Sequence, residues 1–550
     1  MGDRAEKSVI QNWMKPPALG FLRRHQAILL AAGALLLYLA AGNRFFYFRW
    51  EDNAHYYMLG RALAQGQGYT SVYTFPIAPH TKYPFFFPLM LAGVIRAFGE
   101  NLIAIKILIA LCAAITVGAT CRLGEERGDK RIALFAAALA ASVPYTLAFS
   151  VDVLSEIPYA AWAGLTLLWA ERALNKDSAK SPALVAAVFF LLAASFTRSI
   201  GIALGPALVG AALLRSPIRD RLRQNLIPAA AIALPFLAAA GAWYSHGYLA
   251  TRGQGENYFR EFFLQDPSLP SSPRIGLLDV IERVQTNGQY YLEQIGGTLW
   301  PFSSAFGPDR MTGLGLLLAG IALIGFLQVF REQRGAPELY TLAYVSLILV
   351  WGVCHTRFLI PLYPLIIYYL LAGIQALLLG VKFLVSSRPG SILGRIVLST
   401  ATLLMLSSNL VADFRFLLQM TQDRRAQGFP INPRFEVIAT EIHKDRILTL
   451  AVYLRFFAEP GAVVFARYPG LVALASNHPA VGEPFAPDLA GFLVDLEKHR
   501  VRYILWDETY WELGRYLIPA LKAYPERFRL IYQFPGTRDQ IYQYLPAGRD

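Results

Sequence analysis

The sequence predicts a polytopic α-helical membrane protein with a small extracytoplasmic α/β domain at its C-terminus. Of its 550 residues, 55% are hydrophobic and only 16% are charged, a composition too apolar for an ordinary soluble protein. The apolar residues form long runs over most of the chain, whereas shorter aromatic and β-branched segments follow the last run. We therefore expect a transmembrane domain over residues 1–411 and a soluble domain over residues 412–550.

About eleven apolar runs are candidate transmembrane helices, because about 20 residues rising 1.5 Å each cross the hydrocarbon core of a bilayer. The first run follows a basic segment and would also fit a signal peptide, but we interpret it as an uncleaved helix that orients the later spans. The predicted spans cover residues 25–43, 101–121, 131–149, 155–172, 182–196, 200–214, 226–243, 311–330, 338–354, 358–380 and 393–411.

A shorter apolar run, PFFFPLMLAGVIRAF, lies between the first two predicted spans. It extends from Pro84 to Phe98 and contains Arg96, so we expect it to lie along the membrane interface or to dip into it. If this run crossed the membrane, the topology of every later span would invert. Loop charge favours the first version, because the Lys- and Arg-rich loops then share the side of the basic N-terminus.

The charge distribution predicts the orientation and location of the protein. Basic loops mark the cytoplasmic side, so we expect an integral protein of the cytoplasmic (inner) membrane with a cytoplasmic N-terminus and an extracytoplasmic C-terminal domain. The net charge of +13 is explained by these loops, and we expect no nucleic-acid partner. The three cysteines, Cys112, Cys121 and Cys354, lie in or beside apolar runs without a CxxC motif, which indicates neither a disulfide framework nor a zinc site.

The region after residue 412 has the patterns of a mixed α/β domain. The segments AVVFARY, VRYILWD, FRLIYQF and DQIYQYL are typical of strands, because aromatic and β-branched residues dominate them. Between them, DLAGFLVDLEKHR and TYWELGRYLIPALKAYP have helical spacing. No glycine-rich phosphate loop is present, so the pattern does not indicate a nucleotide-binding domain.

Two adjacent carboxylates, Glu51 and Asp52, follow the first predicted span in the stretch FRWEDNAHYYMLGRALAQGQGYT. They could be solvated loop acids or cap an interfacial helix, since Asp favours helix N-termini. They could instead supply a general base at the outer membrane face, able to take a proton from a hydroxyl. Lys82 closes the same outer loop, and Lys106 lies just inside the next span, where it either snorkels to the interface or serves a functional site.

The second outer loop contains two further acids in the stretch SVDVLSEIPYA. Asp152 precedes a predicted helix whose N-cap is Ser155, and Glu156 lies in its first turn, where it would also interact favourably with the helix dipole. A cap explains one acid more easily than two. Asp152 and Asp52 could therefore face one cavity at the outer helix ends and bind a divalent cation such as Mg or Mn, although the sequence establishes no metal.

Two basic residues stand alone in very short outer loops. Arg198 in SFTRSIG and Arg357 in CHTRFLIPLYP lie on the side where positive charge is disfavoured. Lipid headgroups would explain them, and so would a site for phosphate or diphosphate that includes Lys82 and Lys106. His55 is a further candidate for binding substrate, although packing at the interface beside neighbouring tyrosines also explains it.

These stretches together resemble the GT-C superfamily of integral-membrane glycosyltransferases, especially the protein O-mannosyltransferase and aminoarabinose-transferase group related to glycosyltransferase family 39. The resemblance includes EDNAHYYMLGRALAQGQGYT, KYPFFFPLMLAGVIRAFGENLIAIKI, VDVLSEIPY and TRFLIPLYPLI in this order, followed by the C-terminal α/β region. Many relatives have Asp-Glu where this chain has Glu51-Asp52-Asn53, so either Glu51 or Asp52 would be the base. Lys106 stands where some relatives have Arg.

The resemblance implies a GT-C-like fold and transfer of a sugar from a polyprenyl-phosphate-linked donor, with a glycolipid, a glycan or a protein as acceptor. It implies that Asp52 is the catalytic carboxylate and that Asp152 or Glu156 supports it. It implies that Lys82, Lys106, Arg198 and Arg357 bind the donor phosphate. For the acceptor or substrate we expect His55, Tyr56 and Tyr83 as binding residues.

Two other functions compete with this interpretation. A secondary transporter would show inverted repeats and helices broken near the membrane centre, and the sequence shows neither clearly. A non-catalytic protein that binds lipid or assembles an envelope complex would share the fold without turnover. The long outer loop over residues 244–310 and the C-terminal domain are expected to select the acceptor, and ENYFREFFLQDP in that loop is either an interfacial helix near the site or a loop packed on the exported domain.

Overall fold

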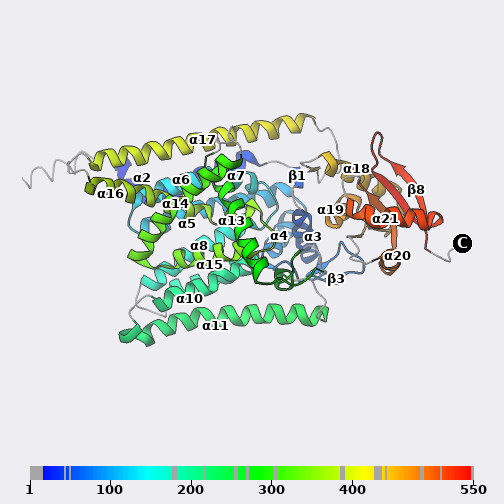
Figure 1. Ribbon diagram of the computed structural model, residues 1–550, viewed down its shortest axis with the longest axis horizontal. Coiled ribbons are helices and arrows are strands. Elements are labelled where there is room, and N and C mark those ends of the chain that lie inside the picture. Colours follow the sequence, from blue (N-terminus) through cyan, green and yellow to red (C-terminus); the bar gives the residue numbers. More distant parts are fainter. Residues whose placement is uncertain are drawn as a thin grey trace, which may run out of the picture.

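The computed structural model consists mainly of helices packed side by side, with a small sheet at one end (Figure 1). The long helices α11 (Ile218–Thr251) and α17 (Gly390–Ala426) lie along opposite edges of the bundle in this view. The structure describes residues 17–42, 45–48, 51–175, 182–214, 218–252, 258–267, 272–300, 308–384, 390–426, 436–439, 442–482, 488–507 and 511–546.

The apolar composition of the first three quarters of the chain explains why this region folds into a helical bundle. The helices of the bundle differ widely in length. Besides α11 and α17 it contains α2 (Pro17–Ala41), α5 (Leu102–Glu126), α6 (Lys130–Ala141), α7 (Pro144–Ser150), α8 (Glu156–Asn175), α9 (Pro182–Thr197), α10 (Leu204–Leu214), α13 (Leu277–Leu299), α14 (Pro308–Gln333), α15 (Ala336–Val350) and α16 (Tyr363–Leu384).

Four helical segments in the described ranges are long and apolar enough to cross a membrane, or five if the bent pair α6 and α7 forms one span. The four are Leu102–Glu126, Asn225–Thr251, Met311–Gln333 and Ile396–Arg415. The chain is therefore an integral membrane protein, but the predicted number of about eleven spans is not confirmed. Several predicted spans correspond to apolar helices of 10–17 residues, and the predicted span 131–149 bends by 55° between α6 and α7.

Local sequence explains where two of these helices begin. The Asn101 side chain accepts hydrogen bonds from the N–H groups of Ile103 and Ala104, which caps α5. The Asp129 side chain caps α6 in the same way. Between α14 and α16, Gly325 and Gly373 lie so close to the opposite backbone that neither position has room for a Cβ atom, which is typical of membrane helices in contact.

Short elements lie at the end of the bundle that faces the sheet (Figure 1). The helix α3 (Asp52–Ala64) packs against α4 (Phe86–Phe98), and the strands β2 (Thr70–Ser71) and β3 (Ala78–Pro79) pair antiparallel between them. With 13 residues, α4 is shorter than a full span, and its position in the membrane stays a prediction. Three further short helices contribute residues to the same cavity as Asp52: α12 (Tyr258–Phe262), η1 (Ser199–Ala203) and η3 (Thr356–Leu359).

The C-terminal region forms a five-stranded mixed sheet in the order β6-β5-β7-β9-β8. The four predicted strand segments become β5 (Val463–Phe465), β7 (Val501–Trp506), β8 (Phe528–Gln533) and β9 (Gln540–Tyr544), whereas β6 (Ala480–Val481) was not predicted. β5 pairs parallel with β6 and β7, whereas β9 pairs antiparallel with β7 and β8. The helices are α18 (Ile442–Phe457), α19 (Pro469–Ser476), α20 (Leu489–Lys498), α21 (Trp511–Ala523) and η4 (Pro525–Arg527).

The C-terminal region is joined to the segments on either side of α3 by backbone contacts that the sequence did not predict. β1 (Phe45–Phe48) pairs parallel with β4 (Glu436–Ala439), and the Ala480 N–H donates to the Tyr73 carbonyl. The helix α19 also packs against α3. Because α17 continues to Ala426, it crosses the predicted boundary at residue 411, and the division into 1–411 and 412–550 stays a prediction.

Candidate active site

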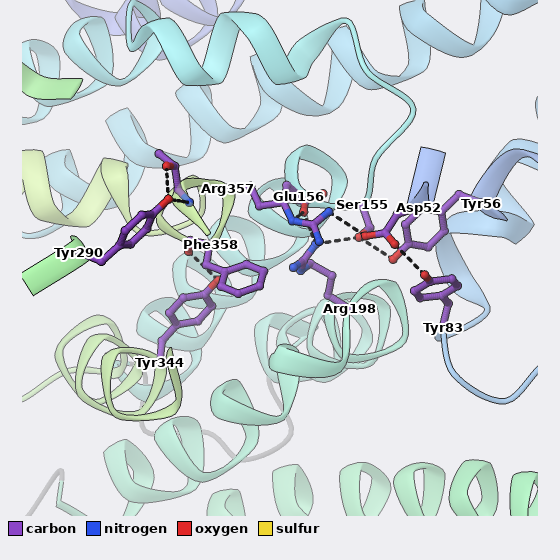
Figure 2. Close-up of polar contacts among 11 residues, drawn as sticks. Asp52, Tyr56, Tyr83, Ser155, Glu156, Arg198, Tyr290, Tyr344, Arg357 and Phe358 are labelled. Carbon is purple, nitrogen blue, oxygen red and sulfur yellow. Dashed lines mark hydrogen bonds and ion pairs between the residues drawn. The ribbon is translucent and has the colours of Figure 1, made fainter. Parts of the chain in front are cut away.

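Asp52 begins α3 and points into a cluster of charged side chains (Figure 2). Its Oδ1 atom accepts a hydrogen bond of 2.7 Å from the Tyr83 hydroxyl, and its Oδ2 atom accepts one of 2.7 Å from Arg357 Nη1. The Glu51 side chain makes no cap hydrogen bond at this helix start. Asp52 thus lies in the first turn of a helix, as one of the two alternatives expected, and its carboxylate is also engaged by residues distant in sequence.

The Arg357 side chain is oriented by a short helix with several supports. η3 carries it, and the Tyr344 hydroxyl donates to the carbonyl of Phe358 over 2.9 Å. The Tyr290 hydroxyl lies 2.9 Å from Thr356 Oγ1 and accepts from the Thr356 N–H over 3.1 Å. These tyrosines come from α15 and α13, so two helices of the bundle hold the η3 backbone in place (Figure 2).

Glu156 connects the two arginines that the sequence singled out. Its Oε1 atom lies 2.6 Å from Arg198 Nη1 and 3.5 Å from Arg357 Nε. Arg198 Nη1 also donates to Ser155 Oγ over 3.1 Å, and that hydroxyl lies 2.9 Å from the Tyr56 hydroxyl. Carboxylates and guanidinium groups thus alternate in the order Asp52, Arg357, Glu156 and Arg198, which balances two negative with two positive charges.

A cavity of about 530 Å³ opens beside this network. Lys82 lies on its wall and pairs with Glu261 on α12 at 2.8 Å. Six of the predicted site residues line the cavity: Asp52, Tyr56, Lys82, Tyr83, Arg198 and Arg357. Aromatic and apolar side chains complete it, among them Tyr244, Tyr258, Phe259, Phe262, Ile348, Trp351, His355 and Phe358.

A second cavity of about 740 Å³ shares three lining residues with the first, Ile202, Tyr244 and Phe259. Its remaining lining comes mainly from the end of α11, with Tyr248 and Leu249 among the residues. The cavity beside Asp52 therefore adjoins a second, more apolar one, and together they give room for a ligand with both a charged group and an apolar part.

The other predicted site residues do not line the cavity. Glu156 is buried behind it and joins it through the two arginines. Asp152 and Lys106 are 1% and 4% exposed, and neither is among the lining residues. Glu51 and His55 turn toward α19, as described below. These positions do not test the predicted roles of Asp152 and Glu156 as supporting acids. They also do not test the roles of Lys106 as a phosphate ligand and of Glu51 as the alternative base.

Several lining residues were not predicted. Tyr258 and Glu261 belong to α12, which confirms that the stretch ENYFREFFLQDP contains a helix near the site. His355 and Trp351 come from the turn before η3. An acid within an aromatic stretch of an outer loop was the only sequence signal for Glu261, and nothing in the sequence indicated that its partner would be Lys82.

The surroundings of Asp52 favour its charged form. Burial raises the pKa of Asp52, but the Arg357 guanidinium and the Tyr83 hydrogen bond outweigh it and hold the pKa well below its usual value. Burial and the nearby Arg357 lower the pKa of His355 to about 4, so this imidazole is neutral at pH 7. Asp52 is therefore a carboxylate beside a neutral imidazole and two arginines.

The described residues do not fit a cation held jointly by Asp52 and Asp152. Over the ranges that the structure describes, no group of three or more His, Cys, Asp or Glu side chains could hold a metal ion. Both Asp52 oxygens already accept hydrogen bonds from Tyr83 and Arg357.

Comparison with known proteins agrees with this fold. Residues 82–244 match the model of a family described as dolichyl-phosphate-mannose-protein mannosyltransferase. ArnT from Cupriavidus metallidurans, solved bound to undecaprenyl phosphate, is 13% identical with a TM-score of 0.51, and the match covers 94% of this chain and 98% of that chain. The chain resembles GT-C membrane glycosyltransferases. This confirms the resemblance that the outer-loop motifs predicted.

Two structures of another GT-C enzyme extend the comparison. The archaeal oligosaccharyltransferase AglB from Archaeoglobus fulgidus, in complex with an inhibitory peptide and a dolichol-phosphate, is 13% identical with a TM-score of 0.56, over 96% of this chain and 75% of that chain. An oligosaccharyltransferase structure from the same organism, a complex with Zn and sulfate, is 13% identical with a TM-score of 0.54, over 94% and 74%. No curated protein matches the sequence.

Proposed function

We propose that this protein transfers a sugar from a polyprenyl-phosphate-linked donor to an acceptor hydroxyl at the outer face of the cytoplasmic membrane, with Asp52 as general base. The observation that carries the proposal is the pairing of Asp52 with Arg357 on the wall of a cavity that also contains Arg198 and Lys82. A base and several cations are the groups that sugar transfer from a lipid phosphate requires.

The arginines and Lys82 bind the donor phosphate in this proposal. A leaving phosphate gains negative charge as the glycosidic bond breaks, and fixed guanidinium donors stabilise that charge best when they are already oriented. η3 and its tyrosine supports orient Arg357, and the ion pair with Glu156 orients Arg198. The apolar space next to the cavity accepts the lipid part of the donor. The relatives solved with undecaprenyl phosphate and dolichol-phosphate support this choice of donor class.

Asp52 takes the proton of the acceptor hydroxyl in this mechanism, and the oxygen attacks the anomeric carbon as the lipid phosphate leaves. The ion pair with Arg357 makes Asp52 a weak base in the state described here. When a donor phosphate competes for the Arg357 guanidinium, the interaction that lowers the pKa of Asp52 weakens, so its basicity rises only when donor is present. Because phosphate is a good leaving group, no second carboxylate is needed as general acid, and inversion at the anomeric carbon is expected.

The proposal is tested with radiolabelled polyprenyl-phosphate sugars and membranes that contain equal amounts of wild type or D52N. Loss of label transfer in D52N is expected, with retained binding of polyprenyl phosphate. Asp495→Asn, the same chemical change on α20 outside the cavity, serves as the matched control and should keep full transfer. Equal transfer by wild type and D52N would contradict the role of Asp52, and no transfer with any donor would favour a non-catalytic protein or a transporter.

A further inference from the structure

A chain of polar contacts leads from Asp52 away from the cavity. The Tyr83 hydroxyl, which donates to Asp52 Oδ1, lies 3.4 Å from His55 Nδ1. On the other side of the same ring, His55 Nε2 lies 3.2 Å from Glu51 Oε1. Asp52, Tyr83, His55 and Glu51 therefore form a continuous series of neighbouring polar side chains, with separations of 2.7, 3.4 and 3.2 Å.

The end of this series lies at the contact with the C-terminal region. Glu51 Oε1 accepts a hydrogen bond of 3.1 Å from the Gly470 N–H in the first turn of α19. A Cβ atom at position 470 would collide with the His55 ring, so only glycine allows this contact. The Glu51 and His55 side chains are 25% and 16% exposed, which gives the outer end of the series access to water.

The His55 ring is held in one orientation by its neighbours. It stacks on Tyr73 with ring centroids 4.7 Å apart and planes inclined by 12°. The titratable groups around it are Glu51 on its own helix, Tyr73, His80 and Tyr83 from the loop between α3 and α4, and Asp52. Burial lowers the pKa of His80 to about 3, so His80 is neutral, and its Nε2 atom accepts from the Tyr83 N–H over 3.0 Å. His80 thus holds the Tyr83 backbone and leaves His55 as the imidazole in contact with the Tyr83 hydroxyl.

We propose that Tyr83, His55 and Glu51 form a relay that carries the acceptor proton from Asp52 to the surface between α3 and α19. This proposal rests on the proposed function, in which Asp52 takes up one proton in each turnover. Protonated Asp52 donates its proton to the Tyr83 oxygen while the Tyr83 proton moves to His55 Nδ1. The resulting imidazolium releases the Nε2 proton to Glu51, which passes it to water. The series ends with one proton released, and rotation of the Tyr83 hydroxyl and a proton shift on His55 restore the starting state.

The relay predicts that the first turnover and the later turnovers respond differently to loss of His55. In H55Q, Asp52 still takes up the first proton, so the rate of the first turnover should stay near that of wild type. The steady-state rate should fall by about tenfold or more, because glutamine cannot accept and release a proton. A merely structural role of His55 would lower both rates together, and equal steady-state rates in H55Q and wild type would overturn the relay.

Chemical rescue gives a second readout. H55A leaves a partly exposed space on Tyr73, and added imidazole should restore a large part of the steady-state rate. Pyrazole is the matched control, because it has nearly the same shape but is almost nonbasic, and it should restore nothing. Equal rescue by both rings, or rescue by neither, would overturn the proposal.

A measurement on the wild-type protein covers the case in which these variants do not fold. Transfer of several protons in one step should make the steady-state rate fall nonlinearly as the fraction of D₂O rises, whereas a linear or absent dependence would overturn the relay.

The D52N variant distinguishes failure of the relay from failure of the proposed function. If D52N retains transfer, the proposed function fails, whereas normal H55Q turnover beside inactive D52N means that only the relay fails.

Discussion

The Asp52 carboxylate and the Arg357 guanidinium are 305 residues apart in the sequence and 2.7 Å apart in the structure. Arg357 also approaches Glu156, which binds Arg198 in turn. The Arg357 guanidinium thus connects Asp52 to Glu156 and, through Glu156, to Arg198. Removal of this group should affect donor binding and the basicity of Asp52 at once.

Replacement of Arg357 by lysine should lower transfer by about 10²-fold or more, similar to loss of one donor that stabilises a developing anion. Lysine keeps the charge but cannot contact Asp52 and Glu156 with separate, oriented N–H groups. The measurement is label transfer together with the Kd of polyprenyl phosphate. Arg455→Lys on α18, outside the cavity lining, is the matched control, and activity of R357K within twofold of wild type would contradict the role of the fork geometry.

The acidic limb of the pH profile should move to higher pH when Arg357 is replaced by glutamine. In wild type the pKa of Asp52 is lowered, so the carboxylate persists below the usual titration range of Asp. Without the guanidinium, burial is the larger remaining effect and raises the pKa. The profile of kcat/KM against pH measures the shift.

The lowered pKa of Asp52 also makes the stability of the fold depend on pH. Because the folded-state pKa of Asp52 is depressed, its ion pair stabilises the fold above the unfolded-state pKa, and this contribution is lost as the pH falls through the folded-state pKa.

The control for the activity profile is K82Q, which leaves both Asp52 contacts intact and should keep the acidic limb of the wild type. An acidic limb at the same pH in wild type and R357Q would show that Asp52 is not the titrating group.

A charge exchange between Lys82 and Glu261 separates two functions of Lys82. These residues pair at 2.8 Å and both line the cavity. If Lys82 only fixes α12, the double variant K82E/E261K restores the pair and should restore activity. We expect restored thermal stability without restored transfer. In the double variant the positive charge lies at position 261 and no longer at position 82, where it binds the phosphate. Full recovery of transfer would show that the pair is structural.

Replacement of Tyr290 by phenylalanine tests the support of η3. The Tyr290 hydroxyl contacts both the side chain and the backbone N–H of Thr356, directly before Arg357. Loss of these contacts should cost about 1–2 kcal/mol of stability and raise the KM for the donor several-fold, with a smaller effect on kcat. Thermal unfolding and donor titration provide the measurements. Tyr532→Phe on β8, outside the cavity lining, is the control, and an unchanged KM in Y290F would contradict the positioning role.

Charged residues are rare beside the apolar runs, and these residues identified most of the candidate site in the sequence. Arg198 and Arg357 stood out because a basic group at that position needs an anionic partner, and the structure pairs them with the predicted acids Asp52 and Glu156. A similar argument, that an ionisable group inside a span needs a partner, selected Lys106, which is buried on α5 and does not line the cavity. Which way a helical side chain points depends on the rotation of its helix against its neighbours, and a single sequence does not contain that information.

The sequence by itself determined that this chain is apolar enough to enter a membrane, that strand patterns follow the last long apolar run, and which charged residues need partners. These properties follow from composition and local periodicity, which depend on the chain alone. Only the tertiary structure decided that Arg357 meets Asp52, that Lys82 meets Glu261, and that Glu51 and His55 face α19. Each of these contacts joins segments distant in sequence, and only the packing of the helices and of the C-terminal sheet brings them within hydrogen-bond distance.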